Sequence, residues 1–183
     1  MTYTLKDVVE AQLFAIQVHQ GQYRKINKKP YIIHILRILE HLHRDFQGKE
    51  LNKLKIIAAL HDSIEDSWVS KQDIEKEFGK EIAIEVYNLS KNKELKQPLQ
   101  EQEYRERLKN ASDEAKIVKL LDIYDNCHDI KNVKEHKERW LKTIQRMEDN
   151  LEVLEVKNLD YKKRFNETKQ ELKEFIKLLK KSV

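Results

Sequence analysis

Residues that form turns are scarce in this sequence, and their scarcity constrains the fold more than any other feature. Only 3 of the 183 residues are glycine and 2 are proline, while 37% are charged. A β-sandwich or β-barrel needs many turns rich in glycine and proline, so a helical fold is favoured. The length suits one domain with a substantial buried core. We therefore predict a single all-α domain over residues 1–183.

Capping signals and apolar spacing divide the chain into predicted helices. Thr4 with Asp7, and Ser70 with Asp73, have the spacing of a capping box and predict two helix starts. Gly79 is expected to separate the short helix after Ser70 from the next one. Apolar residues at helical spacing predict further helices after Pro30 and over residues 52–66, 99–109 and 113–126.

The last fifty residues, 134–183, are rich in Lys and Glu and carry an apolar stripe at helical spacing. In the first half of this segment the stripe consists of Trp140, Ile144, Met147, Leu151 and Leu154. Such a pattern is typical of amphipathic helices packed on a core, and we predict a pair of them. A dimerising coiled coil is the alternative interpretation.

Charge and cysteine content limit the class of partner and the compartment. The 36 basic and 32 acidic residues give a net charge of +4 and are largely interleaved. A stable nucleic-acid partner would need a concentrated basic stripe, whereas a small anion needs only a local basic pocket. No apolar run approaches the ~18 residues of a membrane span. The single cysteine, Cys127, cannot form an internal disulfide. We expect a cytoplasmic protein with no membrane partner.

The segment from residue 58 to residue 67 crowds one histidine and three acids beside an apolar stripe. If it is helical, His61, Asp62, Glu65 and Asp66 lie within an arc of about 140°. No Lys or Arg lies between positions 56 and 67 to balance them. Three neighbouring carboxylates repel one another, and a divalent cation would relieve that repulsion. The segment therefore predicts a metal site, although an exposed acidic helix end would carry the same residues.

Two further polar residues interrupt apolar segments. His34 follows Ile32 and Ile33, and Asp122 lies in the apolar segment 117–123. Each has an ordinary interpretation, because His34 could be a hydrogen-bonded core histidine and Asp122 could pair with Lys119. A buried charge is costly unless it is paired or bound to metal. Together with His61 and Asp62 they would form a mixed nitrogen and oxygen donor set, suited to Mn²⁺, Fe²⁺ or Zn²⁺.

Four blocks of residues occur in one order along the chain. They are His19-x-x-Gln22-x-Arg24-Lys25, Pro30-Tyr31-Ile32-x-His34, His61-Asp62-x-x-Glu65-Asp66 and Lys119-x-x-Asp122-x-x-x-Asn126. In order and spacing these blocks resemble the hydrolase domain of the RelA/SpoT family, and above all its stand-alone small alarmone hydrolases. The similarity covers about residues 5–140. It implies an HD-domain helical bundle that hydrolyses the 3′-pyrophosphate of (p)ppGpp to GDP or GTP and pyrophosphate.

The resemblance also implies a metal and a catalytic pair. The positions that match the family's metal ligands are His34, His61, Asp62 and Asp122. Mn²⁺ is the family's usual ion, and another divalent transition metal is an alternative. Glu65 and Asp66 match the pair that orients and deprotonates the attacking water.

Further positions match the family's substrate contacts. Arg24 and Lys25 match its basic residues at the substrate, and Asn126 matches a polar contact to the nucleotide. Lys91 and Lys93 follow in the region where the family often has another phosphate-binding lysine. The implied partner is a small anionic nucleotide, and a separately encoded alarmone synthetase is the implied counterpart.

Some positions depart from the family pattern. Asp125 stands where a bulky or aromatic residue is usual, and His128 stands where arginine is common. Trp140 falls near an aromatic position that can contact the nucleotide. We expect these changes to border the substrate pocket and not the metal site. Two alternatives therefore remain open: an HD phosphohydrolase for another nucleotide phosphate (an adenine alarmone, the 2′-phosphate of NADPH or a pyrophosphorylated RNA 3′ end), and a non-catalytic helical binding module.

Overall fold

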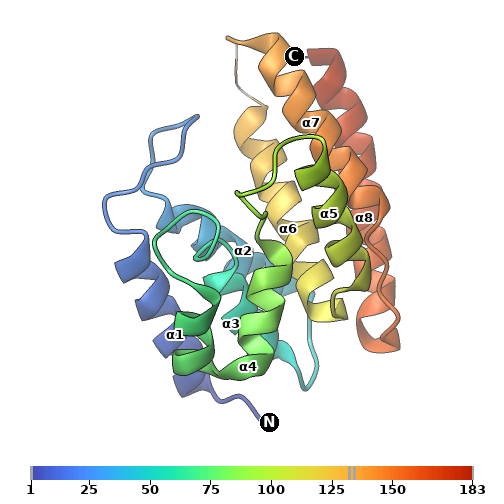
Figure 1. Ribbon diagram of the computed structural model, residues 1–183. Coiled ribbons are helices and arrows are strands. Elements are labelled where there is room, and N and C mark those ends of the chain that lie inside the picture. The colour runs from blue at the N-terminus through green and yellow to red at the C-terminus, as the bar shows by residue number, and fades with distance from the viewer. Residues whose placement is uncertain (1, 132, 134, 183) are drawn as a thin grey trace.

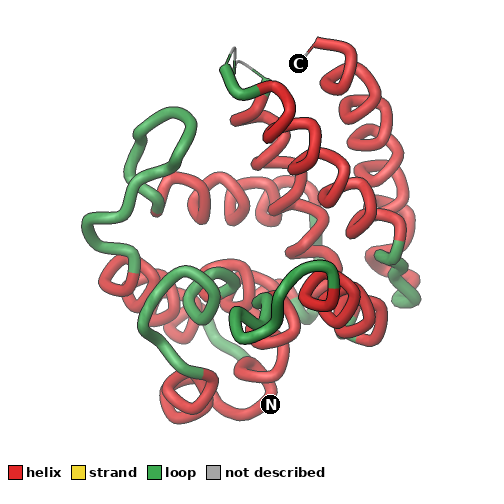
Figure 2. Tube along the Cα trace, turned by 45° about the horizontal axis from the view of Figure 1, so that its top comes forward, coloured by secondary structure: helices red, strands yellow, loops and turns green. Residues whose placement is uncertain are grey.

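The computed structural model describes residues 2–131, 133 and 135–182, and in this part of the chain every regular element is a helix (Figures 1 and 2). The predicted all-α fold is confirmed. In chain order the helices are α1 (Leu5–Val18), α2 (Ile32–Asp45), α3 (Leu51–Leu60), α4 (Lys71–Leu89), α5 (Leu99–Asn110), α6 (Asp113–Ile130), α7 (Lys137–Glu152) and α8 (Leu159–Ser182).

Helix α3 lies at the centre of the N-terminal half of the molecule. From Leu54 onward it is apolar on almost every side, and its last five residues, 56–60, are buried. A helix that is apolar all round must be covered by neighbours, and α1, α2, α4 and α6 all contact it. Helix α3 therefore ends in the interior of the protein, and His61, the next residue, is also buried.

Helices α7 and α8 lie together beside α6, as the orange and red ribbons show (Figure 1). Ile144, Leu151 and Leu154 from the apolar stripe are buried, and Trp140 and Met147 pack against the same core. In α8 the buried residues are Tyr161, Phe165, Thr168, Leu172, Ile176 and Leu179. The stripe thus faces the protein's own core, as expected for packed amphipathic helices.

The predicted helix starts are confirmed at two capping boxes. The Thr4 hydroxyl accepts the backbone N–H of Asp7, and the Asp7 carboxylate accepts the N–H of Thr4, with the same exchange between Ser70 and Asp73. Gly79 has φ 85° and ψ 162° and breaks α4 into two parts, as predicted. These backbone angles lie in a region that is essentially restricted to glycine.

One predicted boundary is wrong. The helix expected over residues 52–66 ends at Leu60, and residues 61–65 form turns. The backbone N–H of Ser63 bonds to the carbonyl of Leu60, and that of Asp66 bonds to the carbonyl of Asp62. The side chain of His61 competes for a helical acceptor, because its Nδ1 lies 2.8 Å from the carbonyl oxygen of Ala58. The acidic residues are therefore gathered by a series of turns and not by one helix face.

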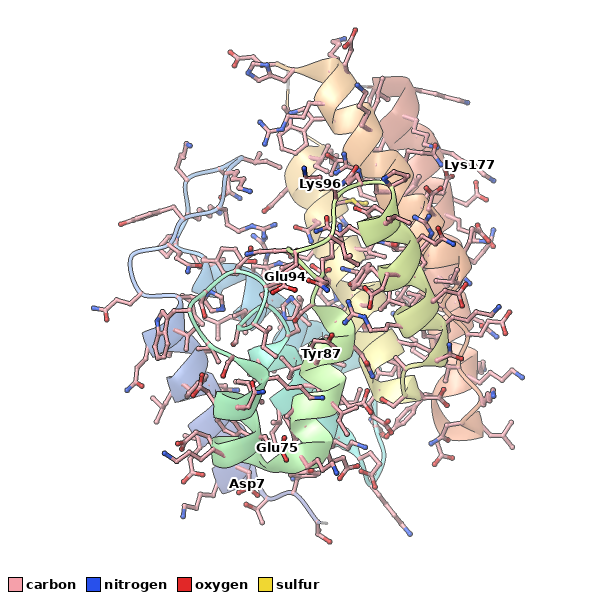
Figure 3. All side chains as sticks on the ribbon, viewed as in Figure 1. Asp7, Glu75, Tyr87, Glu94, Lys96 and Lys177 are labelled. Carbon is pink, nitrogen blue, oxygen red and sulfur yellow. The ribbon has the colours of Figure 1, made fainter. Side chains whose placement is uncertain are left out.

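The segment between α4 and α5 is a polar loop. Figure 3 labels Tyr87 in the last turns of α4, and Glu94 and Lys96 on this loop. Arg107 of α5 donates to the carbonyl oxygens of Tyr87, at 2.5 Å, and Ser90, at 2.8 Å. The guanidinium therefore fixes the start of the loop, which carries Lys91. No helix in the described part of the chain is long and apolar enough to cross a membrane.

Candidate metal centre and cleft

His34 is held in the first turn of α2 with one ring nitrogen committed to a hydrogen bond. The side chain is fully buried, and its Nδ1 lies 2.6 Å from Oδ2 of Asp125. An ionised carboxylate can only accept here, so Nδ1 carries a proton, and in the neutral ring Nε2 is the nitrogen with the lone pair. Among the described residues Nε2 has no hydrogen-bond partner. A buried nitrogen with a free lone pair is suited to bind a metal.

His61 has the same arrangement. Its Nδ1 donates to the carbonyl oxygen of Ala58 at 2.8 Å, and its buried Nε2 has no hydrogen-bond partner among the described residues. The two imidazole rings lie 5.3 Å apart between centroids. Two buried histidines thus direct lone pairs toward one point, although 27 positions (61 − 34) separate them in sequence.

Two carboxylates complete this group. Asp62 Oδ2 lies 2.9 Å from Nε2 of His61 and 3.6 Å from Nε2 of His34. Asp122 Oδ1 lies 3.2 Å from Nε2 of His34 and 3.9 Å from Nε2 of His61. One donor atom each from His34, His61 and Asp122 falls within 4.8 Å of the others. Two imidazoles that become neutral donors once Nε2 loses its proton, together with two facing carboxylates, fit a divalent transition metal.

The carboxylates also change the protonation of these groups. Burial opposes a charge on His61, but Asp62 and Asp122 outweigh it and raise its pKa to about 9. Burial likewise opposes ionisation of Asp62, but the neighbouring His61 holds the pKa of that carboxyl well below its usual value. In the absence of a cation, a proton on His61 would balance part of the negative charge of Asp62 and Asp122. Metal and proton therefore compete for this site.

Asp122 also has the ordinary partner suggested by its sequence neighbourhood. Lys119 donates to its Oδ2 at 2.7 Å, while Asn126 donates to its Oδ1 at 2.5 Å. The half-buried lysine is itself charged, because Asp122 overcomes the effect of desolvation and raises the pKa of Lys119 well above its usual value. The ion pair and the approach of Asp122 to both histidines thus coexist.

Glu65 and Asp66 lie on the turns that follow His61. Glu65 Oε2 accepts the backbone N–H of Lys91 at 2.8 Å, and burial together with Asp62 raises the pKa of Glu65. Asp66 is more exposed, and its Oδ2 lies 3.2 Å from the hydroxyl of Tyr31. Both acids line the same cleft as Asp62 and Asp122. They are therefore close to the donor set without belonging to it.

This cleft has a volume of about 330 Å³ and is lined in part by Asp62 and Asp122, the two carboxylates beside the histidines. Its acidic lining consists of Asp62, Glu65, Asp66 and Asp122, and its basic lining consists of Arg24, Lys25, Lys91, Lys119 and Arg146. Helix α7 contributes Trp140, Met147 and Asn150 to the lining. A cleft with carboxylates at one place and five cations around them can accept an anion that bridges to a metal.

The predicted substrate residues do not all reach the cleft. Arg24, Lys25, Lys91 and Asn126 line it, whereas Lys93 is not among its lining residues. The ammonium group of Lys93 instead donates to the backbone carbonyl of Glu65. Lys91 donates to Glu101 at 2.9 Å, so its charge is shared with a buried carboxylate.

The expectation that the departures from the family pattern avoid the metal site is wrong for Asp125. This carboxylate is buried and bonds to His34 itself. His128 is exposed, stacks on Phe175 of α8 at 4.7 Å and does not line the cleft. Trp140 does line it, as expected, and its buried Nε1 has no partner among the described residues.

Sequence reasoning missed several residues of the site. Tyr31, Arg37 and Asp129 all bond to site residues, but only Tyr31 lies in the recognised blocks, where it was given no role. Arg37 and Asp129 stand in α2 and at the end of α6, 92 positions apart, where a charged residue is unremarkable in a chain with so many charges. Only the fold brings them together.

Comparison with known proteins identifies the family. The HD domain family matches residues 11–147. A guanosine-3′,5′-bis(diphosphate) 3′-pyrophosphohydrolase MESH1 from Xenopus tropicalis is 33% identical over 129 residues, which span 68% of this chain and 69% of the relative. The Drosophila melanogaster MESH1 is 27% identical over 157 residues, spanning 82% of this chain and 87% of the relative.

A solved structure agrees with the sequence comparison at the level of the fold. It is that of a metazoan ortholog of SpoT that hydrolyzes ppGpp, with a TM-score of 0.75 and 24% sequence identity. The match covers 93% of this chain and 98% of the other. The chain therefore belongs to the HD domain family and, within it, is a relative of the MESH1 proteins.

Proposed function

We propose that this protein is a metal-dependent 3′-pyrophosphohydrolase that converts (p)ppGpp to GDP or GTP and pyrophosphate. The observation that carries the proposal is the pair of buried Nε2 atoms, on His34 and His61, that face two carboxylates at a cleft lined by basic residues. The MESH1 relatives are guanosine-3′,5′-bis(diphosphate) 3′-pyrophosphohydrolases, which supports the choice of substrate.

The donor set would hold one divalent cation through His34, His61, Asp62 and Asp122. The cation supplies Lewis acidity, which polarises phosphoryl oxygens and makes a water molecule more acidic. We propose Mn²⁺ as this ion, because neutral imidazoles combined with carboxylates suit it and because it is the usual ion of the family the sequence resembles. The histidines keep their Nε2 lone pairs free through the bonds that both Nδ1 atoms donate.

Glu65 and Asp66 are the proposed catalytic carboxylates. Both line the cleft beside Asp62, where a carboxylate can accept a proton from the attacking water and orient it toward the phosphorus. Glu65 is held through the backbone N–H of Lys91, so its position depends on the loop after α4. A second carboxylate nearby lets one acid orient the water while the other takes the proton.

Arg24, Lys25, Lys91 and Asn126 are the proposed substrate contacts. The three cations of this set, Arg24, Lys25 and Lys91, can neutralise the pyrophosphate as the bond to the ribose 3′-oxygen breaks. We leave Lys93 out of this set, because its ammonium group is engaged by the carbonyl of Glu65. We propose a cytoplasmic location, compatible with the free buried thiol of Cys127, and a separate alarmone synthetase as the source of the substrate.

The experiment that tests the substrate is comparative turnover by the purified protein with Mn²⁺. The compounds are ppGpp, an adenine alarmone, NADPH and an RNA with a 3′-pyrophosphate, and the products are identified by chromatography. We expect preferred turnover of ppGpp with release of pyrophosphate and GDP. A clear preference for another compound would replace the substrate and retain the chemistry. No turnover of any compound, by protein that binds Mn²⁺, would contradict the enzymatic proposal.

A further inference from the structure

Asp125 lies directly behind a proposed metal ligand. Its carboxylate is buried in α6, three residues beyond Asp122, and its Oδ2 accepts the Nδ1 proton of His34 at 2.6 Å. The sequence comparison with the RelA/SpoT pattern gives no role to this position, where a bulky or aromatic residue is usual. A carboxylate behind a histidine ligand fixes the tautomer and makes the imidazole a better donor.

Arg37 holds Asp125 in place. Its Nε donates to Asp125 Oδ1 at 2.5 Å and its Nη2 donates to Asp125 Oδ2 at 2.7 Å, so the guanidinium grips both oxygens. Paired parallel bonds of this kind fix the plane of a carboxylate as well as its position. Arg37 is one helical turn after His34 in α2, so the proposed ligand and the arginine that holds Asp125 lie on the same helix. A buried carboxylate without such a partner would be costly.

The same arginine connects the metal site to the cleft. Arg37 Nη2 also donates to Asp129 Oδ1 at 3.1 Å, and Asp129 Oδ2 accepts Nε of Arg24 at 3.0 Å. Arg24 donates in turn to Asn126 at 2.5 Å, and Asn126 donates to Asp122. The bonds thus form a continuous path from one proposed ligand, His34, through Arg24 to another, Asp122.

We infer that Asp125 is a positioning residue for the metal ligand His34 and that Arg37 is the anchor that aligns it. The inference rests on the proposed metal centre. Asp125 is not itself among the residues that line the cleft, and it acts through the imidazole of His34. Because Arg37 and Asp129 join it to Arg24, the alignment of His34 and that of the basic residue in the cleft depend on the same arginine.

The test is titration of the metal-free full chain with Mn²⁺ alone, followed by calorimetry, with thermal unfolding measured in the absence of metal. The variants are Asp125→Ala, Asp125→Asn and Arg37→Met. Asp45→Asn is the matched control, since it removes another carboxylate that is bonded to an arginine on α2, Arg44, away from the cleft. Removal of a group behind a ligand typically weakens metal binding about 10- to 100-fold.

We expect Asp125→Ala to weaken Mn²⁺ binding by about that factor. Asp125→Asn should lose less, because the amide oxygen still accepts from His34, and Arg37→Met should fall between Asp125→Asn and the wild type. Asp45→Asn should bind as tightly as the wild type. If Asp125→Ala does not fold, Asp125→Asn and Arg37→Met carry the comparison.

Two contrary results are distinguishable. If the wild type binds Mn²⁺ and the folded Asp125 and Arg37 variants bind it as tightly as Asp45→Asn does, the positioning role is wrong while the metal centre stands. If the wild type itself binds no Mn²⁺, the proposed metal centre fails and the positioning role fails with it.

Discussion

The hydroxyl of Tyr31 donates to Oδ2 of Asp62 at 2.5 Å and lies 3.2 Å from Oδ2 of Asp66. One proton serves two carboxylates, so only one of them can accept it at a time. The ring is held by stacking on His19, with 4.7 Å between centroids. Tyr31 therefore joins a proposed metal ligand to a proposed catalytic acid.

Tyr31→Phe should lower kcat for ppGpp with little change in KM. The substitution keeps the ring and its stacking on His19 but removes the hydroxyl from both carboxylates. Loss of a hydrogen bond to a charged, partly buried group costs about 1–3 kcal/mol, or about 5- to 160-fold in rate. Steady-state kinetics measure it. Tyr124→Phe, which removes a hydroxyl away from the cleft, is the control, and equal rates for the two variants would contradict this role.

Removal of metal should destabilise the protein. A ligand that binds only the native state at 100 times its Kd stabilises it by about 2.7 kcal/mol, which is about 5–10 °C in Tm for a chain of this size. Differential scanning fluorimetry with Mn²⁺ and then with excess chelator measures the shift. His61→Ala should show no Mn²⁺-dependent shift. A shift of equal size in this variant would locate the metal elsewhere.

Asp45 should make stability depend on pH in the acid range. Its bonds with Arg44, aided by Arg164 of α8, lower its pKa to about 2, against about 3.9 in an unfolded chain. A depressed pKa contributes stability that is fully present above the unfolded value and is lost as the pH falls toward the folded one. The stability gap between wild type and Asp45→Asn should therefore be constant above about pH 5 and close between about pH 4 and 2.

Chemical denaturation at a series of pH values measures this gap. High salt should narrow it at every pH, because part of the pair is open to solvent and is screened. A gap that stays constant down to pH 2 would contradict the assignment to Asp45.

Gly79→Ala should destabilise α4 for a conformational reason alone. A Cβ at this position would meet no atom within 4 Å, so there is no steric clash. The backbone angles, φ 85° and ψ 162°, are nevertheless costly for alanine by about 1–3 kcal/mol. Equilibrium unfolding measures the loss, and Lys80→Ala is the neighbouring control. An unchanged free energy of unfolding would contradict a conformational cost of alanine at position 79.

Local signals in the sequence predict most of the helical framework. The boxes at Thr4 and Ser70, the break at Gly79 and the apolar stripe of residues 140–154 each depend on residues close together in the chain, and each appears as predicted. The end of α3 does not lie where the sequence predicts it, because a helix face and a series of turns can both gather residues 61–66. The side chain of His61, bonded to the carbonyl of Ala58, decides between them.

The residues of the site likewise divide into those that the local sequence indicates and those that only the fold brings together. His34 and Asp122 stand out in sequence because each is a polar residue in an apolar segment, and the structure brings both to His61. The roles of Asp125, Arg37 and Asp129 depend on contacts between residues about 90 positions apart, which no local pattern records. The family pattern even directs attention away from Asp125, since a different residue type is usual there.

The most direct test of the central claim is hydrolysis of ppGpp by the purified chain with Mn²⁺, compared with His61→Ala/Asp62→Ala. We predict that the wild type releases pyrophosphate and GDP and that the double variant, folded by circular dichroism, loses both Mn²⁺ binding and turnover. Turnover that persists in the double variant at the wild-type rate would contradict a metal-dependent reaction at this centre.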